Sequence, residues 1–148
     1  MTLLINADRF KEDFDQLAQI GSTADGGVNR PALSAAHLEA RAWFNAKAAS
    51  AGLRTQTDSA GNVSAILESP ISNLQSLLLG SHTDSVPNGG RFDGALGIVA
   101  ALEVLRTIKE SGVQLKVNLE AIDFTDEEGT LVGLLGSSAL VGGITQES

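Results

Sequence analysis

A strand–helix–strand order across residues 77–125 constrains the fold of this chain more than any other feature. Residues 77–80, LLLG, form a short apolar run typical of a strand that is buried on both faces. Residues 94–111 are rich in Ala, Leu, Ile and Val and predict a largely buried helix, and residues 116–125 predict the next strand. Strands joined through a helix are nearly always parallel, so we expect an α/β fold in which these two strands are parallel neighbours.

Two flanking helices are expected before the first of these strands. Residues 8–20 carry apolar side chains at helical spacing. After a loop rich in Gly, Asn and Pro, Ser34 can cap a second helix that ends near Gly52. The apolar stripe of this second helix is expected to contain Leu38, Ala42 and Ala46.

Two further elements complete the expected domain. Residues 53–57 and 63–67 flank the turn sequence DSAGN and predict a β-hairpin. Residues 133–142 predict a short helix interrupted by glycine. Residues 1–148 are therefore expected to form one βαβ-containing sheet with flanking helices.

Composition excludes several classes of function. The net charge of −8 and the lack of basic runs argue against binding to nucleic acid. Without cysteine, the chain forms no disulfide or thiolate metal site, so a transition-metal site would need His and carboxylates. No apolar run approaches the ~20 residues that span a bilayer, and no signal peptide is evident, so we expect a cytoplasmic protein without a membrane partner.

Two groups of potential metal ligands directly follow the two parallel strands. Ligands of open α/β sheets bind beyond the carboxyl ends of the strands, so both groups should meet at one end of the sheet. Carboxylates packed this closely repel one another unless they are protonated or share a cation, and a divalent metal is the simplest resolution. The groups are His82, Asp84 and Asp93 after the first strand, and Asp126, Glu127 and Glu128 after the second.

Each of these residues has a simpler explanation when it is taken alone. Asp93 could cap the helix that follows it, and the acidic run could be a solvated loop or a helix start. The only other histidine, His37, lies in a predicted surface helix far from these segments, and we interpret it as structural or solvent-facing. It is the arrival of both groups at matching ends of neighbouring strands that favours a metal site.

The residue types also suggest a division of roles. His82 can give one imidazole nitrogen to a metal while Asp84 holds the other nitrogen, and Asp93 has two oxygens that could bridge two metals. Adjacent Glu127 and Glu128 cannot easily point the same way, so one can ligate while the other acts as general base toward a water activated by the metal. This chemistry hydrolyses amide-like bonds.

The segments GSHTDSVPNGGRFDG and FTDEEG resemble the M20-type zinc aminoacylase and peptidase superfamily. Within it they are most similar to the branch of N-carbamoyl-L-amino-acid hydrolases, β-ureidopropionases and allantoate amidohydrolases. The short spacing from His82 to Asp93, without the longer insertion of the exopeptidases, favours this branch. So do GGVNRPALS at 26–34, DSAGN at 58–62 and GLLGSSAL at 133–140.

The resemblance implies a role for each residue and two divalent metals, zinc or else manganese, cobalt or nickel. His82 would bind one metal, Asp93 would bridge, and Glu128 would bind the second. Glu127 would be the general base, and Asp84 would orient His82. The implied substrate is a small N-carbamoyl amino acid or ureido compound. The chain departs from the family at residues 130–132, where an Arg-Phe pair is common, and at Ser138, where an Arg is common.

Length is the largest departure, because family members are considerably longer than this chain. Their remaining metal-ligand histidines, their substrate-binding residues and a dimerisation domain would all follow residue 148. The chain is therefore expected to be a partial zinc-peptidase-like catalytic domain with a metal half-site and negligible activity alone. An uncovered strand edge is expected to favour a homo-oligomer. An M20 aminopeptidase or aminoacylase and a non-catalytic α/β module remain the alternatives.

Overall fold

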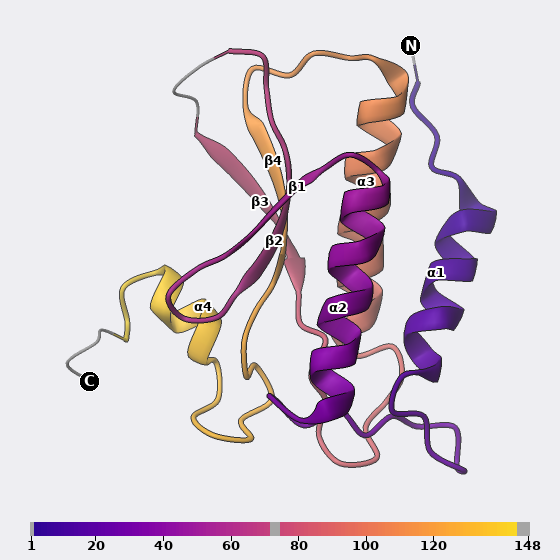
Figure 1. Ribbon diagram of the computed structural model, residues 1–148, viewed down its shortest axis with the longest axis vertical. Helices are drawn as coiled ribbons and strands as arrows, with labels where there is room; N and C mark the ends of the chain where they lie inside the picture. Colours follow the sequence, from indigo (N-terminus) through magenta and orange to yellow (C-terminus); the bar gives the residue numbers. More distant parts are fainter. Residues whose placement is uncertain (1, 72–74, 145–148) are drawn as a thin grey trace.

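The computed structural model describes residues 2–71 and 75–144 and confirms an α/β fold. Four strands form one sheet in the order β1-β2-β4-β3. Helices α2 and α3 cover one face of it, and α1 packs against these two helices on their outer side (Figure 1). The short helix α4 lies apart from these three, beside the end of the sheet where the hairpin turns (Figure 1). The elements are α1 (Ala7–Gln19), α2 (Ala35–Ser50), β1 (Arg54–Thr57), β2 (Val63–Leu67), β3 (Ser76–Ser81), α3 (Ala95–Ser111), β4 (Asn118–Asp123) and α4 (Leu135–Leu140).

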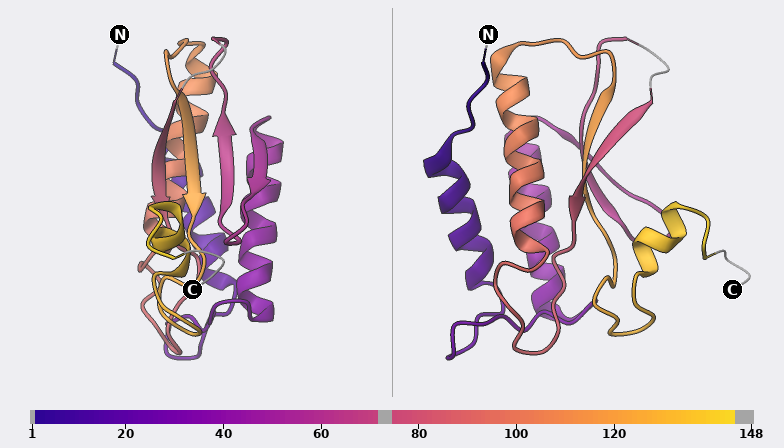
Figure 2. Two further views of the ribbon diagram at one scale, coloured as in Figure 1. Left: turned by 90° about the vertical axis from the view of Figure 1, so that its left-hand side faces the viewer. Right: turned by 180° about the vertical axis from the view of Figure 1, so that it is seen from behind.

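The βαβ unit has the predicted direction and neighbours. Strands β3 and β4 are parallel, and their last residues, Ser81 and Asp123, pair with each other, so both strands end at the same level of the sheet. The two strands run side by side toward the same end of the molecule (Figure 2). Strand β2 is antiparallel to β4 on its other side and also pairs with β1, as expected for the hairpin. The segments that follow β3 and β4 therefore start next to each other.

The prediction that β3 is buried on both faces is wrong. Strand β3 lies at the edge of the sheet, its residues are exposed or half-buried, and the side chain of Leu77 is 54% exposed. The reason is topological, because β4 is inserted between β3 and the hairpin. Within the described residues, one side of β3 has no neighbouring strand.

The core lies between the sheet and helices α2 and α3. Its buried members include Phe44 and Leu102 from the helices and Ala65 and Ala121 from the sheet. Full burial of a side chain such as Phe44 stabilises the fold by roughly 1.5–3 kcal/mol.

The predicted apolar stripe of α2 is on the wrong side of the helix. Ala42 and Ala46 are exposed, and Leu38 is 53% exposed. The large apolar area of Phe44 determines instead which face turns inward. The other buried residues on that face are His37, Ala40, Arg41 and Ala48.

Ion pairs between buried or half-buried side chains fasten α1 to its neighbours. The guanidinium of Arg9 binds the buried carboxylate of Glu103 on α3 at 2.8 Å. The buried carboxylate of Asp13 contacts Arg106 of α3 and lies 2.7 Å from the ammonium of Lys47 on α2. Loss of both cations from Asp13 would leave its buried charge uncompensated, and breaking a buried ion pair in this way typically costs about 3–5 kcal/mol. No helix in the described part of the chain is long and apolar enough to cross a membrane.

Candidate metal centre

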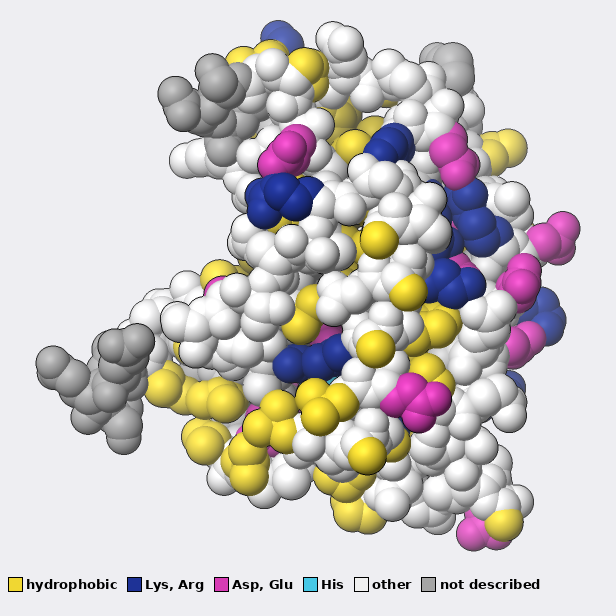
Figure 3. Space-filling view, in the orientation of Figure 1, with side chains coloured by type: hydrophobic (Ala, Val, Ile, Leu, Met, Phe, Trp, Pro, Cys, Tyr) yellow, Lys and Arg dark blue, Asp and Glu magenta, His cyan; other side chains and the backbone are white. Residues whose placement is uncertain are grey.

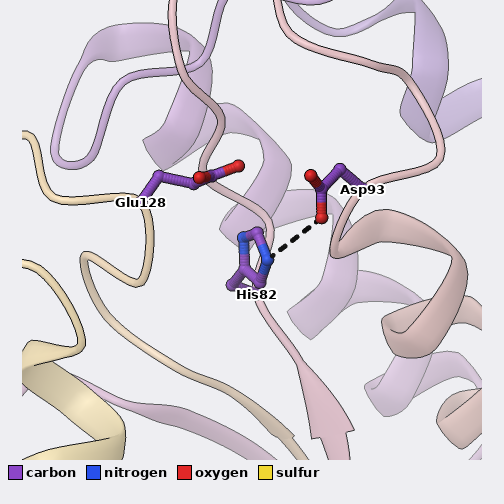
Figure 4. Close-up of side chains that lie close together, drawn as sticks. All are labelled: His82, Asp93 and Glu128. Atoms are coloured by element: carbon purple, nitrogen blue, oxygen red, sulfur yellow. Dashed lines mark ion pairs between the residues drawn. The ribbon is translucent and has the colours of Figure 1, made fainter.

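The side chains of His82, Asp93 and Glu128 converge beyond the carboxyl ends of β3 and β4. Each offers one potential ligand atom, and these atoms lie within 4.8 Å of one another. The three side chains point toward a common centre, and His82 Nε2 is 3.7 Å from an oxygen of Asp93 (Figure 4). His82 is buried, Glu128 is half-buried and Asp93 is exposed, so the cluster is rigid on one side and open to solvent on the other.

A glycine at position 94 lets His82 and Asp93 come together. Gly94 has φ +61°, and a Cβ there would lie 2.3 Å from the carbonyl oxygen of His82 and 2.6 Å from its ring. Gly94 is also the residue at the start of α3, and no side chain caps the helix there. The alternative in which Asp93 caps this helix is therefore wrong.

Asp84 connects the two segments that carry the ligands. It is fully buried, and its carboxylate oxygen Oδ2 accepts a hydrogen bond from the backbone N–H of Glu128 at 3.1 Å. Its other oxygen is 3.5 Å from His82 Nδ1, which also lies 3.0 Å from the backbone oxygen of Asp84. These contacts leave His82 Nε2 facing Asp93.

The same contacts govern the protonation of the site. Burial alone would lower the pKa of His82, but its contacts with the carboxylate and the backbone oxygen of Asp84 outweigh burial and raise the pKa to about 9. For Asp84, burial acts to raise the pKa, yet the nearby imidazole of His82 and the hydrogen bond from Glu128 lower it overall. Burial and the neighbouring charge of Asp93 raise the pKa of Glu128. This mutual repulsion of carboxylates is what a cation would relieve.

The three consecutive acidic residues after β4 have different contacts. Glu127 accepts a hydrogen bond from the hydroxyl of Ser137 at 2.9 Å, whereas Glu128 joins the cluster. Asp126, with φ +52°, folds its carboxylate onto its own loop and accepts hydrogen bonds from backbone N–H groups. Asp126 therefore shapes the loop and does not contribute a ligand. The donors to Asp126 are Thr130, Leu131, Val132 and Gly133.

A buried ion pair beneath the cluster was missed by sequence reasoning. Asp123, the last residue of β4, accepts hydrogen bonds from the N–H and the hydroxyl of Thr83 at 2.7 and 2.9 Å. The guanidinium of Arg41 on α2 binds the same carboxylate at 3.2 Å and also donates to the hydroxyl of Thr125. Burial raises the pKa of Asp123 to about 6 although Arg41 opposes it. The available signal was a lone Asp at the end of an otherwise largely apolar strand.

Arg30 was also missed, although it is fully buried beside the first ligand segment. Its guanidinium donates to the backbone oxygens of Thr83, Leu17 and Ile20 at 2.8–2.9 Å. Its backbone N–H donates to the hydroxyl of Ser85 at 2.9 Å. Arg30 thus fixes the residues on both sides of Asp84.

Of the two interpretations of His37, the solvent-facing one is wrong, whereas a structural one agrees with its hydrogen bond from Leu33. Its side chain is not solvent-facing and not remote, because it is fully buried and senses the charges of Asp84 and Asp126. Burial, followed by the positive charge of Arg41, lowers its pKa to about 4. The helix turns this face inward together with Phe44, which local spacing could not reveal.

The chain is similar to known amidohydrolases and to a peptidase family. The sequence profile of Peptidase family M28 matches residues 62–148. The N-carbamoyl-L-amino-acid amidohydrolase of Pseudomonas sp. (strain NS671) is 38% identical over 99% of this chain and 36% of its own length. The allantoate amidohydrolase of Bacillus subtilis (strain 168) is 40% identical over 77% of this chain and 28% of its own length.

A solved structure agrees with these relatives. A hydantoinase/carbamoylase family amidase from Burkholderia ambifaria superimposes with a TM-score of 0.94 and 35% identity, over 98% of this chain and 36% of that one. The predicted resemblance to carbamoyl-amino-acid and allantoate amidohydrolases is thereby confirmed, and the family profile that matches carries the designation M28. The chain spans 36% of the length of the Pseudomonas amidohydrolase, little more than a third.

Proposed function

Because this chain belongs to peptidase family M28, we propose that it carries part of the metal centre of an amidohydrolase for N-carbamoyl or ureido compounds. The observation that carries the proposal is the convergence of His82, Asp93 and Glu128 within 4.8 Å. The relatives named for carbamoyl amino acids and allantoate support the substrate class.

The donor set suits divalent transition metals. One imidazole with carboxylates is compatible with zinc, manganese, cobalt or nickel. If two metals bind, His82 would hold one, Glu128 would hold the other, and Asp93 would contribute to both. When bound, such metals polarise a carbonyl oxygen and make water more acidic.

The chain's own carboxylates would handle the proton. Glu127 is adjacent to the cluster in sequence, and Ser137 holds one of its oxygens, so its other oxygen is available to accept a proton from the attacking water. The water oxygen would add to the carbamoyl carbon, and the C–N bond would then break. The departing nitrogen would take up the proton held by Glu127. Asp84 would keep the ring of His82 in place throughout.

We further propose that the isolated chain holds a half-site. It supplies about two protein ligands to each of two metals, whereas catalytic zinc sites use three and structural sites four. Weak metal binding and negligible turnover are therefore expected from the 148 residues alone.

Metal content after dialysis against Zn²⁺ or Mn²⁺ tests the proposal. Wild-type chain should retain metal that His82→Ala loses, and Glu127→Gln should retain it as the wild type does, because Glu127 is the proposed base and not a ligand. Equal metal content in wild type and His82→Ala would refute the site and leave a non-catalytic α/β module. Robust hydrolysis of N-carbamoyl amino acids by the pure chain would refute the half-site.

The peptidase designation of the matching family favours a second candidate, an aminopeptidase or aminoacylase. The same residues would serve, because both reactions hydrolyse an amide-like bond. A panel of N-carbamoyl amino acids, N-acetyl amino acids and dipeptides, assayed on a form as long as the relatives, separates the two candidates. Preference for the N-carbamoyl compounds is expected.

A further inference from the structure

Three fully buried polar atoms behind the metal cluster have no hydrogen-bond partner among the described residues. They are Nη2 of Arg30, Nε2 of His37 and Oδ1 of Asp84. A buried polar atom without a partner costs about 1–3 kcal/mol, so three such atoms in one small domain require an explanation.

The three groups are neighbours. Arg30 donates to the backbone oxygen of Thr83 at 2.8 Å and to the hydroxyl of Ser85 at 2.9 Å, the two residues that flank Asp84. The charge of Asp84 acts on both Arg30 and His37, and the charge of Arg30 acts on His37. The members of the trio are therefore within electrostatic range of one another.

Their hydrogen-bonding roles are complementary. His37 Nδ1 accepts the backbone N–H of Leu33 at 2.8 Å, so the neutral ring carries its proton on Nε2. The guanidinium of Arg30 can only donate, and the carboxylate oxygen of Asp84 accepts. Two buried donors and one buried acceptor, all without a partner among the described residues, match the two to four polar partners that a buried water needs.

We infer that a water molecule is bound at this point, accepting hydrogen bonds from Arg30 Nη2 and His37 Nε2 and donating one to Asp84 Oδ1. His37 and Arg30 are then positioning residues for Asp84. Asp84 Oδ1, the oxygen that accepts from the water, lies 3.5 Å from His82 Nδ1. By holding this carboxylate, the water fixes the orientation of the imidazole. The water itself is independent of the proposed function, whereas its effect on metal binding rests on that proposal.

Two variants at position 37 separate this role from a structural one. The amide of Asn reaches about as far as imidazole Nδ1, so His37→Asn keeps an acceptor for the N–H of Leu33 and lacks the donor to the water. The amide of Gln reaches about as far as Nε2, so His37→Gln restores that donor and lacks the acceptor. The free energy of unfolding should fall more in His37→Gln than in His37→Asn.

Zn²⁺ affinity is expected to follow the opposite order. Loss of a group that orients a metal ligand typically weakens binding by about 10–100-fold, so His37→Asn should bind Zn²⁺ at least about tenfold more weakly than wild type. His37→Gln should bind it about as well as wild type. Affinities that instead follow stability would overturn the positioning role.

A crystal structure of the 148-residue chain tests directly whether the water is bound. Density for a water within hydrogen-bond distance of all three atoms is expected in the wild type and in His37→Gln. A direct contact between His37 Nε2 and Asp84 Oδ1, or no ordered water between the three groups, would overturn the inference. If the wild type binds no Zn²⁺, the proposed function fails, and the crystal structure still decides whether the water is there.

Discussion

The carboxylate of Asp84 accepts a hydrogen bond from the backbone N–H of Glu128, 3.1 Å away. The same side chain lies against the ring of His82. One buried residue thus holds together a ligand that follows β3 and a ligand that follows β4. The two segments are distant in sequence, and this contact adds to the pairing of β3 with β4 in fixing their relative position.

Substitution Asp84→Asn should weaken Zn²⁺ binding by about 10–100-fold, because the amide is neutral and no longer favours the orientation of His82. Isothermal titration with Zn²⁺ measures the change. Asp25→Asn is the matched control, since Asp25 is an exposed loop carboxylate. Equal losses in the two variants would show that only net charge matters.

Substitution Gly94→Ala should both destabilise the chain and disrupt the metal cluster. The added Cβ meets the carbonyl and ring of His82, in addition to the strain of a positive φ. Gly112→Ala is a close control, because Gly112 has φ +70° and a Cβ there meets nothing within 4 Å.

Urea denaturation should show a loss of about 1 kcal/mol for Gly112→Ala and a further 1–3 kcal/mol for Gly94→Ala. Zn²⁺ affinity should fall in Gly94→Ala alone. Equal losses of stability in both variants would mean that His82 moves aside without cost.

The stability of the chain should depend on pH through His37. Its pKa is about 4 in the folded chain and 6.5 ordinarily, so the unfolded chain binds a proton first as the pH falls. Stability contributed by neutral His37 is fully present above pH 6.5 and is lost as the pH falls toward 4.

Between pH 8 and pH 5 this loss should amount to about 2 kcal/mol. Urea denaturation of wild type and His37→Gln at both pH values isolates the effect, because Gln does not titrate and other groups contribute equally to both chains. Identical pH dependence in the two chains would show that His37 is not buried in its neutral form.

Self-association is expected through the side of β3 that has no neighbouring strand among residues 2–71 and 75–144. Leu77 is 54% exposed there, and hydrophobic side chains also gather at the end of the molecule that holds α4 and the loop after β4 (Figure 3). Substitution Leu77→Lys places a charge on the edge strand and should shift the chain toward monomer in analytical ultracentrifugation. Leu38→Lys, at a 53% exposed helical position, should leave the association unchanged. A monomeric wild type would contradict the expectation.

The parts of the site that depend on local sequence could be predicted. The convergence of His82, Asp93 and Glu128 was expected because each comes after a strand, and parallel neighbouring strands bring their succeeding loops to one end of a sheet. Sequence also indicated that Glu127 and Glu128 diverge, since adjacent side chains of an extended chain point apart.

The parts that could not be predicted depend on packing between distant segments. The inward face of α2 is set by the core it meets, so His37 and Arg41 were not recognised as neighbours of the site. The edge position of β3 depends on where β4 inserts, which no local pattern of β3 encodes. Asp126 is a residue type that can bind a metal. Only the structure shows that its carboxylate instead accepts hydrogen bonds from four backbone N–H groups.

The pairing of Ser81 with Asp123 has a consequence for how such a centre tolerates sequence change. Successive side chains of a strand alternate between faces, so a slip of one residue would send His82 and Thr83 to each other's side. The imidazole would then leave its carboxylates, and Asp123 would lose both donors on Thr83. Insertions and deletions within β3 or β4 should therefore abolish metal binding even where the chain still folds. The turn between β1 and β2 is tied to the same end of the sheet, because Asn62 accepts a hydrogen bond from the backbone N–H of Thr125 at 2.9 Å.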